Sequence, residues 1–550
     1  MKSFTKPARE IEKISGNIVD VVHSTIYPAT VILESGKIKE IVRENKEYNT
    51  FIIPGLIDAH VHIESSMLVP SEFARLAVVH GTVSTVSDPH EIANVLGVAG
   101  IEYMLSDARK VPFKFYFGAP SCVPATKFET SGAEIDIALL DELLSRPQIK
   151  YLSEMMNYPG VINGDPQVLA KIEVAKKYKK PIDGHAPGLR GEALKKYAEA
   201  GITTDHETYE LEEALEDITL GMKVMIREGS AAKDFNALHT LIAKHPRSVM
   251  FCSDDKHPDD LMHGHINQLV KRALDLGYDK MDVLRIASYN PIKHYGLEVG
   301  LLQKGDWADF AVIDNFKNFN IIKTYINGRL VAEKGKSFLE KASEGGINNF
   351  NAHPKKVSEF AIKAQNSLIN VIEVIDGELI TRKIKIIPKV SNGYIVSDVE
   401  GDILKIAVVN RYREAPVAVG FIKNFGIKKG AIASSVAHDS HNIVAVGASD
   451  KDLASAVNLV IHNHGGLALT CGIYKEILKL PVAGLMSNRD GYQIAKKYSE
   501  LNIAARKLGC NLKAPYMTLS FMALLVEPEI KLSDKGLFDS IYFKFINLFE

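Results

Sequence analysis

The sequence contains few cysteines, and no two of them are close together. The four cysteines lie far apart and form no CxxC pair; they are Cys122, Cys252, Cys471 and Cys510. This spacing excludes both the disulfide framework of a small secreted domain and a zinc site built from cysteines. We therefore expect reduced thiols in a cytoplasmic protein.

Long apolar runs and an excess of charge are also lacking. No apolar run approaches the roughly 18 residues that span a bilayer, and the first residues, MKSFTKPAREIEKISG, have no apolar core of a signal peptide. Lysine plus arginine (66) nearly balance aspartate plus glutamate (67), for a formal net charge of -1. This balance gives no electrostatic reason to expect a nucleic acid or a membrane as a partner.

The alternation of short and long apolar runs predicts the fold of the central part. The chain has 550 residues, too many for one hydrophobic core, so we expect two or three domains. Eight strand-like runs, the first FIIPGLIDAH and the last SVMFCSDD, alternate with amphipathic stretches whose apolar residues recur every three or four positions. Eight such units in roughly 250 residues are the size of a (β/α)8 barrel, a TIM-like α/β fold. We place it at residues 51–299, with an open doubly wound sheet as the alternative.

Two further regions flank the predicted barrel. Residues 1–50 and 300–342 are rich in strand-like hairpins, and we expect them to form one small β-sandwich from both ends of the barrel segment. The polar, Gly- and Asn-rich stretch that begins at Ser343 reads as a linker. Residues 350–550 alternate strands and helices again and are expected to form a C-terminal α/β domain.

Ionisable residues gather at one end of the predicted strands. In a (β/α)8 barrel the catalytic groups come from the C-terminal strand ends. The residues at these ends are Asp58, His60, His62 and Glu64; Asp88, His90 and Glu91; Glu154; Asp183 and His185; Asp205, His206 and Glu207; and Asp254 and Asp255. Core histidines or solvated charges would not be restricted to one end, so this placement predicts an active site there.

The spacing of the first two histidines favours a metal site. His60 and His62 are two residues apart on a strand, so both side chains leave the same face. Two convergent imidazoles form half of a divalent-metal site, although an isolated HxH pair is more often structural. Because His185 and His206 also end strands and Glu154 lies nearby, the whole set predicts metal binding.

Several motifs resemble those of a known family. PGLIDAHVH is similar to the first metal motif of the amidohydrolase superfamily, and the order of ligands in that superfamily is matched by His60, His62, Glu154, His185, His206 and Asp254. Many members carry a carboxylated lysine after the fourth strand, where this chain has glutamate in SEMMN. That change, together with HIESSML, DPHEIANVLG, DGHAPGL and SDDKHPDDL, resembles the bacterial adenine deaminases. The likeness extends to SSVAHDSHNI and HNHGGLALT in the last domain.

The resemblance implies a reaction, a cofactor and a partner. It implies two divalent metal ions bridged by Glu154, with manganese expected first and iron or zinc as alternatives. A metal-bridged hydroxide would attack C6 of adenine to give hypoxanthine and ammonia, a reaction of purine salvage. Asp254 would act both as a metal ligand and as the proton shuttle. The partner would be a purine base, and a homo-oligomer is expected.

Further residues are candidates for contacts with the substrate. His90 and Glu91 end the second strand and are predicted to be catalytic, although Glu91 could instead cap the next helix. Glu228, at the end of the seventh strand, is a tentative substrate contact, with an ordinary ion pair as the alternative. His438 and His441 could reach over the barrel mouth to bind the purine, or could belong to a hydrogen-bonded turn.

Two other functions compete with this prediction. A cyclic-amide hydrolase of the hydantoinase or dihydroorotase kind would use the same scaffold, but Glu154 in place of lysine counts against it. A catalytically inactive homologue used in assembly is the second alternative. Such proteins typically lose metal ligands, whereas this chain keeps all of them.

Overall fold

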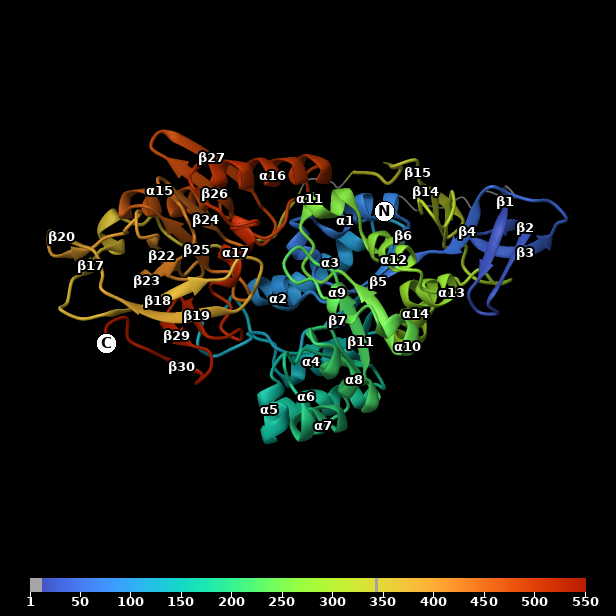
Figure 1. Ribbon diagram of the computed structural model, residues 1–550, viewed down its shortest axis with the longest axis horizontal. Coiled ribbons are helices and arrows are strands. Elements are labelled where there is room, and N and C mark those ends of the chain that lie inside the picture. Colours follow the sequence, from blue (N-terminus) through green and yellow to red (C-terminus); the bar gives the residue numbers. More distant parts are fainter. Residues whose placement is uncertain (1–11, 342–344) are drawn as a thin grey trace.

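The computed structural model describes residues 12–341 and 345–550. Residues 1–11 of the first flanking segment, and Ser343 at the start of the predicted linker, lie outside the described residues. Three parts follow one another along the long axis of the molecule (Figure 1): a β-sheet at the N-terminal end, a barrel in the middle and a C-terminal domain at the other end.

The middle part contains eight parallel strands in chain order. They are β5 (Leu56–Val61), β6 (Thr82–Ser87), β7 (Lys114–Ala119), β8 (Ile149–Met155), β9 (Ile182–Gly184), β10 (Thr204–Asp205), β11 (Lys223–Arg227) and β12 (Val249–Cys252). Strands β5–β9 and β10–β12 form two sheets. Backbone hydrogen bonds close both gaps: Thr203 donates to Ile182 at 2.8 Å, and Asp254 donates to His60 at 2.9 Å. The predicted barrel is confirmed, and the open sheet is wrong.

Helices cover the outside of the barrel. They are α1 (Pro70–Ala77), α2 (His90–Leu96), α3 (Val98–Ala108), α4 (Ile137–Ser145), α5 (Tyr158–Asn163), α6 (Pro166–Lys177), α7 (Gly191–Glu199), α8 (Leu211–Thr219), α9 (Phe235–Leu238), α10 (Leu241–Lys244), α11 (Pro258–His263), α12 (Ile266–Asp275), α13 (Lys280–Leu284) and α14 (Asn290–Tyr295). Helix α12 shows why: it buries Ile266, Leu269, Val270 and Ala273, which share one helical face. Among residues 12–341 and 345–550, no helix has both the length and the apolar character of a membrane span.

The two segments that flank the barrel come together in one sheet. Its strands are β1 (Glu12–Asp20), β2 (Thr25–Glu34), β3 (Lys37–Arg43), β4 (Phe51–Pro54), β13 (Phe310–Ile313), β14 (Ile321–Ile326), β15 (Arg329–Glu333) and β16 (Lys336–Ser337). The sheet curls, since Ile38 on β3 donates to the Asp306 carbonyl at 2.9 Å. The two flanking segments therefore form one small β domain, as expected, and its strands belong to a single curled sheet.

The run FIIPGLIDAH is two strands and not one. Strand β4 pairs with β13 in the flanking sheet, and β5 enters the barrel after Gly55. A Cβ atom at Gly55 would lie 2.3 Å from Cγ2 of Val83, so only glycine lets the chain pass so close to β6. The barrel therefore begins at residue 56, and our expected boundary at residue 51 included a strand of the flanking sheet.

The C-terminal domain is built on an eight-stranded sheet. In spatial order its strands are β19 (Thr381–Ile386), β18 (Ile369–Val374), β23 (Ala418–Lys423), β22 (Ile403–Val409), β25 (Ile443–Gly447), β24 (Ala431–Ser434), β26 (Gly466–Cys471) and β27 (Tyr474–Lys479). The pairs are antiparallel except β18 with β23. The alternation of strands and helices in the sequence therefore corresponds mostly to antiparallel pairing.

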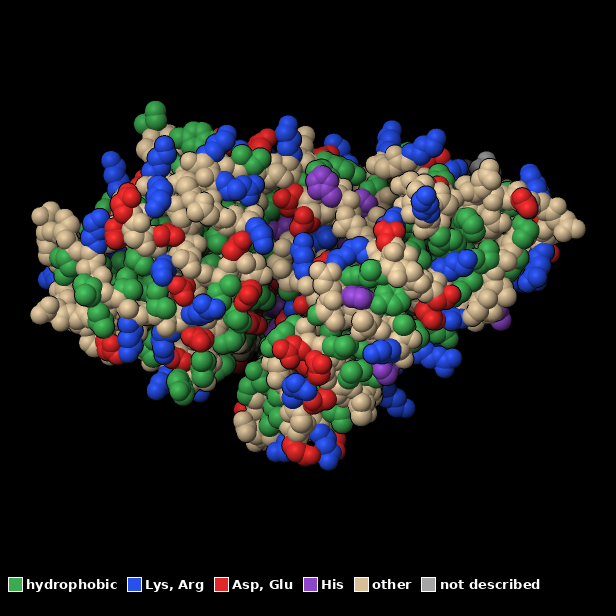
Figure 2. Space-filling view, in the orientation of Figure 1, with side chains coloured by type: hydrophobic (Ala, Val, Ile, Leu, Met, Phe, Trp, Pro, Cys, Tyr) green, Lys and Arg blue, Asp and Glu red, His purple; other side chains and the backbone are tan. Residues whose placement is uncertain are grey.

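The two faces of this sheet pack against different partners. One face, with Ala433 and Ala445, packs on α15 (Asp450–His462). The other face, with Ile432 and Val444, belongs to the same apolar cluster as the barrel core. Helices α16 (Gly491–Lys507) and α17 (Pro515–Phe521) and a small sheet of β28 (Ile530–Ser533), β29 (Gly536–Asp539) and β30 (Lys544–Phe545) complete this side. The domain therefore packs directly on the barrel, and Figure 2 shows the surface hollowed between the two.

A buried polar network links three barrel strands to α12. His265 Nε2 lies 2.7 Å from Asp58 Oδ2 on β5, and its Nδ1 lies 2.9 Å from Thr82 Oγ1 on β6. Asp58 also accepts from the backbone N–H of Ser253, just after β12, at 2.9 Å. Because His265 is 1% exposed, each of these groups depends on the network for its hydrogen bonds.

We predict that His265→Ala destabilises the protein strongly. The substitution leaves the buried Asp58 carboxylate short of a donor and opens a cavity, for a loss of about 3 kcal/mol of unfolding free energy. Urea unfolding followed by circular dichroism measures the change. The control is His263→Ala, two residues away and exposed, which should shift stability by less than about 0.5 kcal/mol. Equal unfolding midpoints for the two variants would contradict the prediction.

Candidate active site

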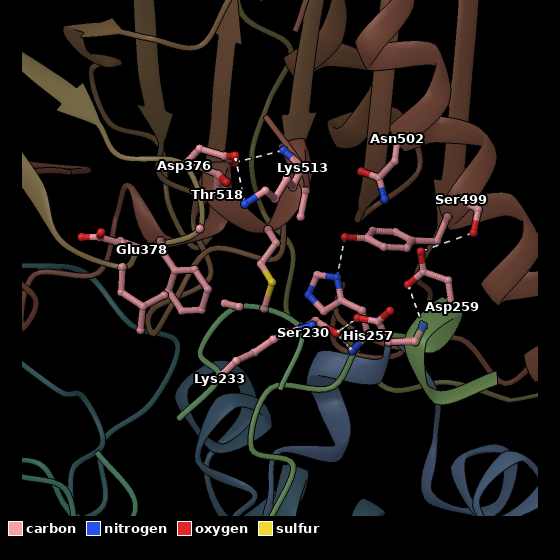
Figure 3. Close-up of a pocket in the computed structure, with 18 of the residues that line it drawn as sticks. Ser230, Lys233, His257, Asp259, Asp376, Glu378, Ser499, Asn502, Lys513 and Thr518 are labelled. Carbon is pink, nitrogen blue, oxygen red and sulfur yellow. Dashed lines mark hydrogen bonds and ion pairs between the residues drawn. The ribbon is translucent and has the colours of Figure 1, made fainter. Parts of the chain in front are cut away.

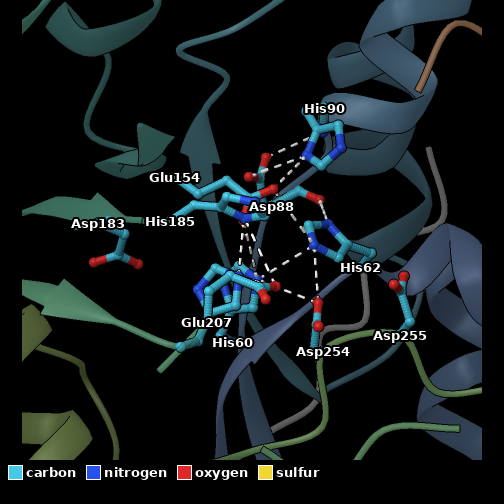
Figure 4. Close-up of polar contacts among 12 residues, drawn as sticks. His60, His62, Asp88, His90, Glu154, Asp183, His185, Glu207, Asp254 and Asp255 are labelled. Atoms are coloured by element: carbon cyan, nitrogen blue, oxygen red, sulfur yellow. Dashed lines mark hydrogen bonds and ion pairs between the residues drawn. The ribbon is translucent and has the colours of Figure 1, made fainter. Parts of the chain in front are cut away.

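The predicted site residues meet at the C-terminal end of the barrel strands. His60 and Glu154 lie on β5 and β8, and His185 and His206 directly follow β9 and β10. Figure 4 shows the side chains of His60, Glu154 and His185 pointing toward one another, whereas Asp183 lies apart from them. The structure therefore brings together groups that are up to 194 residues apart in the sequence, from His60 to Asp254.

Glu154 lies at the centre of the cluster. Its Oε2 atom is 2.9 Å from His206 Nε2 and 3.1 Å from His185 Nδ1. Its Oε1 atom is 3.2 Å from His90 Nδ1 and 3.7 Å from His62 Nε2. The two oxygens of one carboxylate thus face different groups of imidazoles, which is the arrangement that a bridging ligand needs.

Asp254 completes the other side of the cluster. Its Oδ1 atom is 3.1 Å from His62 Nε2 and 3.6 Å from His60 Nε2, and these two ring nitrogens are 3.2 Å apart. Asp254 has a left-handed backbone with a φ of 53°, a conformation in which aspartate is enriched over most residues. The backbone hydrogen bonds of residue 254 to His60 and His62 fix this conformation.

The donor set fits divalent metal ions. Ligand atoms of His60, His62 and Asp254 lie within 4.8 Å of one another, and so do those of His60, Glu154 and His206. His62 Nδ1 lies 3.2 Å from the Asp88 carbonyl oxygen, which favours the tautomer that leaves Nε2 as the ligand atom. Buried imidazole nitrogens and carboxylate oxygens that converge in this way are the ligands of zinc, iron and manganese sites.

Positive neighbours keep the two carboxylates ionised. Burial opposes ionisation of Glu154, but the charge of His185 and hydrogen bonds from His185 and His206 hold its pKa well below the usual value. For Asp254, hydrogen bonds from His60 and His62 and the charge of Arg227 likewise outweigh burial and lower its pKa. Both groups can therefore serve as anionic ligands at neutral pH.

Arg227, the last residue of β11, holds the outer oxygen of Asp254. Its Nη1 atom donates to Asp254 Oδ2 at 2.9 Å and also to Glu207, and its Nε atom donates to Asp234 at 3.0 Å. The guanidinium is buried, so these contacts leave it little freedom to move. It fixes the Asp254 carboxylate with one oxygen toward the histidines.

The C-terminal domain reaches the barrel mouth through the stretch HDSHN. His438 Nδ1 is 3.2 Å from Glu91 Oε1, and His441 Nε2 is 3.9 Å from Glu91 Oε2. Asp439 Oδ1 is 3.6 Å from His90 Nε2. Burial lowers the pKa of His438, but the negative charge of Glu91 outweighs this effect and raises the pKa to about 9. The contact between the two side chains is therefore an ion pair. The two histidines therefore lie beside Glu91, and the contacts with the purine that were expected of them stay predictions.

Glu228 is the site residue that the structure does not bring to the cluster. It follows Arg227 directly, and neighbouring residues at a strand end point to opposite faces. Its carboxylate pairs with Arg272 on α12, and it lines a separate surface pocket with Lys233 and Lys256. Our expectation of a substrate contact is corrected to the ion pair that was the alternative.

Several residues at the site were not assigned a role from the sequence. Asp88 is 3.2 Å from His90 Nδ1, and Glu207 shares a potential ligand group with His185 and His206. Asp88 and Glu207 both follow strands and were among the strand-end residues found in the sequence, but neither was given a role there. Arg227 and Asp439 are adjacent to predicted residues, whereas Phe521 carries no such signal in the sequence.

The cluster opens onto a small pocket of about 30 Å³, which His438 lines but His441, Asp88 and Arg227 do not; this is below the roughly 300–1,000 Å³ of typical small-molecule sites. Its walls include the apolar side chains of Met156, Leu379, Phe521, Leu524 and Val526. A second, larger cavity of about 580 Å³ lies beside it, between the loops after β11 and β12 and helices α16 and α17 (Figure 3). Leu379 and Phe521 line both spaces and therefore separate them.

Comparison with known proteins assigns both parts of the chain. Residues 51–331 match the amidohydrolase family, and residues 378–544 match the adenine deaminase C-terminal domain. The chain is 54% identical to the adenine deaminase of Sulfurovum sp. over 536 residues, which cover 97% of this chain and 99% of the relative. It is 52% identical to that of Methanosarcina mazei over 554 residues, covering 98% and 100%. The chain belongs to the adenine deaminase family.

Membership in the adenine deaminase family confirms the resemblance drawn from the motifs. It makes the chain a hydrolase of the amidohydrolase type with a candidate cluster for divalent metal ions. The match to the adenine deaminase C-terminal domain includes His438, Asp439 and His441. Neither a hydantoinase nor an inactive assembly protein is the family that the comparisons show.

We predict that Glu154→Gln lowers metal content. The change keeps the shape of the side chain but removes the negative charge that faces the histidines, so both metal positions should weaken. Metal analysis after dialysis against a weak chelator measures the ions retained per chain. Asp183→Asn is the matched control, because Asp183 is also buried but bonds to Tyr295 and Thr204. Full occupancy in Glu154→Gln would rule out Glu154 as the bridge.

Proposed function

We propose that the protein hydrolyses adenine to hypoxanthine and ammonia and so acts in purine salvage. The observation that carries this proposal is the cluster of His60, His62, Glu154, His185, His206 and Asp254 beside a pocket that the C-terminal domain helps to line. Adenine deaminase is the name of each of the relatives described above, and their likeness covers nearly the whole chain.

The lining of the pocket favours a neutral, flat substrate. Among the described residues that line it there is no lysine or arginine, so a phosphate or carboxylate on the substrate would find no ammonium or guanidinium group to pair with. This counts against dihydroorotate, which carries a carboxylate. Phe521, Leu524 and Val526 offer apolar surface to a ring, and the carboxylates and histidines offer hydrogen bonds to its edge.

Six residues would hold two metal ions. His60, His62 and Asp254 face one position, His185 and His206 face the other, and Glu154 lies between them. Divalent ions bound there supply a water molecule that is acidic enough to attack at neutral pH. Manganese is our first expectation for the metal, with iron or zinc as alternatives.

Asp254 is suited to move the proton. Its ionised carboxylate accepts a proton from the attacking water as the C6–O bond forms. It then delivers that proton to the exocyclic nitrogen, and the C6–N bond breaks with release of ammonia. Arg227 at 2.9 Å keeps the carboxylate in place during both transfers.

His90 and Glu91 are proposed to contact the ring. His90 lies between Glu154 and Asp439, and Glu91 is paired with His438. Both side chains are buried at the pocket. A ring nitrogen of the substrate that replaces one of these ion-pair partners would therefore gain a hydrogen bond to His90 or Glu91.

The proposal also includes the cellular location and the oligomeric state of the enzyme. The four cysteines are unpaired, as a reducing compartment requires, and three of them are buried. We propose a cytoplasmic location and a homo-oligomer, which fractionation and analytical ultracentrifugation test separately from activity.

We predict that Asp254→Asn loses turnover while the histidine ligands and Glu154 remain. Without the proton shuttle, kcat for adenine should fall by about a hundredfold or more, and KM should change much less. Ammonia release by the manganese-loaded protein gives both constants, and metal analysis is run on the same sample. Near-normal turnover in this variant would transfer the role to Asp255 or His90.

We further predict that adenosine is a poor substrate and that His438→Ala and His441→Ala reduce turnover of adenine. A pocket that encloses the base would leave no room for a ribose, and removal of either ring alters the surroundings of Glu91. Both metal ions should stay bound in both variants, because neither histidine belongs to the proposed ligand set. If both variants turned over adenine normally while adenosine was still refused, the HDSHN stretch would be a structural turn.

A further inference from the structure

A lysine is completely buried beneath the wall of the metal pocket. Lys531 lies on β28, in the C-terminal domain, and has no exposed surface. Its Nζ atom donates to the Leu379 carbonyl oxygen at 2.6 Å and to the Phe521 carbonyl oxygen at 3.1 Å. Lys531 does not itself line the metal pocket, so it does not touch the proposed substrate.

The two carbonyl groups belong to the residues that separate the metal pocket from the larger cavity. Leu379 lies in the turn between β18 and β19, and Phe521 is the last residue of α17. We call these two side chains the partition. The turn and the helix are far apart in sequence; the Lys531 ammonium joins the turn to the end of α17, and Lys513 N–H, which donates to Asp376 at 3.0 Å, joins it to the start. Thr381 strengthens the junction, since its N–H donates to the Pro528 carbonyl at 2.9 Å.

The partition also supports the polar side of the site. The Phe521 ring stacks on the His438 ring, with centroids 4.7 Å apart and planes 9° apart. His438 in turn pairs with Glu91 at 3.2 Å. A shift of Phe521 would therefore change both the apolar wall and the position of the Glu91–His438 pair.

Lysine suits this position better than an apolar residue. Burial lowers the pKa of Lys531 to about 8, and the nearby Glu527 opposes that shift, so the side chain is mostly charged at pH 7. A cation is favourable near the C-terminal end of α17, where backbone carbonyls point. An apolar side chain of the same length would leave two carbonyl groups without these donors.

We propose that Lys531 is a positioning residue, which sets the shape of the purine pocket by fixing Leu379 and Phe521 between that pocket and the larger cavity. This inference rests on the proposed function. Backbone bonds, such as that from Leu532 N–H to the Met522 carbonyl at 3.0 Å, would still hold the two elements, but the Leu379 and Phe521 carbonyl groups would lose the donor that they share. The two side chains of the wall would then shift and admit water, which weakens the binding of the base more than the chemistry at the metal cluster.

The test compares Lys531→Met, Lys531→Arg and Lys405→Met in the full-length, manganese-loaded protein. Lys405 on β22 is the matched control: it has no exposed surface, and its Nζ atom donates to the Phe360 carbonyl at 2.9 Å and to Asp450. It lies in the same domain but lines neither the metal pocket nor the larger cavity. The two methionine variants should therefore lose comparable stability.

Steady-state ammonia release then separates the two roles. Lys531→Met should raise KM for adenine about tenfold, with kcat within about threefold of wild type and metal content unchanged. Lys531→Arg, which keeps a donor, should recover most of the lost affinity, and Lys405→Met should leave KM within about twofold. An unchanged KM in Lys531→Met, with the same loss of stability as Lys405→Met, would make Lys531 purely structural and overturn the inference.

A second variant covers the case in which Lys531→Met does not fold. Phe521→Ala removes one side chain of the partition and leaves the carbonyl contact to Lys531 in place, so it should also raise KM about tenfold at unchanged metal content. A normal KM in Phe521→Ala would overturn the inference as well. Failure of the proposed function is distinct, because the wild-type protein itself would then release no ammonia from adenine.

Discussion

The site depends on the convergence of one carboxylate with histidines from several strands. Glu154 faces His62, His90, His185 and His206 within 3.7 Å. Each of these residues sits at or just beyond the end of its own strand, so they meet only when the barrel closes. The contacts that close it are short backbone hydrogen bonds at β9–β10 and at Asp254. Barrel closure and formation of the metal cluster are therefore one event, which is why ionisable groups can be buried there at all.

The C-terminal domain supplies the other half of the pocket. Its inner face joins the barrel in one apolar cluster, which is a firm attachment and not a loose contact between two domains. From this base it brings His438 and Asp439 to the residues that follow β6 and places Phe521 against the metal cluster. A barrel alone offers an open mouth, and the second domain narrows that mouth with His438, Asp439 and Phe521.

Two buried cations control the geometry without lining the pocket. Arg227 holds the outer oxygen of Asp254, and Lys531 holds two carbonyl groups of the wall. Both are surrounded by acceptors that would otherwise lack donors, so each is bound in one orientation. A buried cation thus supports each side of the site: Arg227 donates to carboxylate oxygens on the polar side, and Lys531 donates to backbone carbonyl oxygens on the apolar side.

Local patterns in the sequence were enough to predict the barrel and the histidines at the strand ends, because hydrophobic periodicity and strand-end placement do not depend on which strands pair. The pairing of strands β4 and β13, the mostly antiparallel C-terminal sheet and the outward direction of Glu228 were decided by tertiary structure. Sequence order cannot tell which of Arg227 and Glu228 points inward, since that depends on where the strand ends relative to its neighbours. Nor could it reveal Lys531, because a lysine in a short strand is ordinarily solvated, and only the packing of β28 against the turn at Leu379 and the end of α17 buries it.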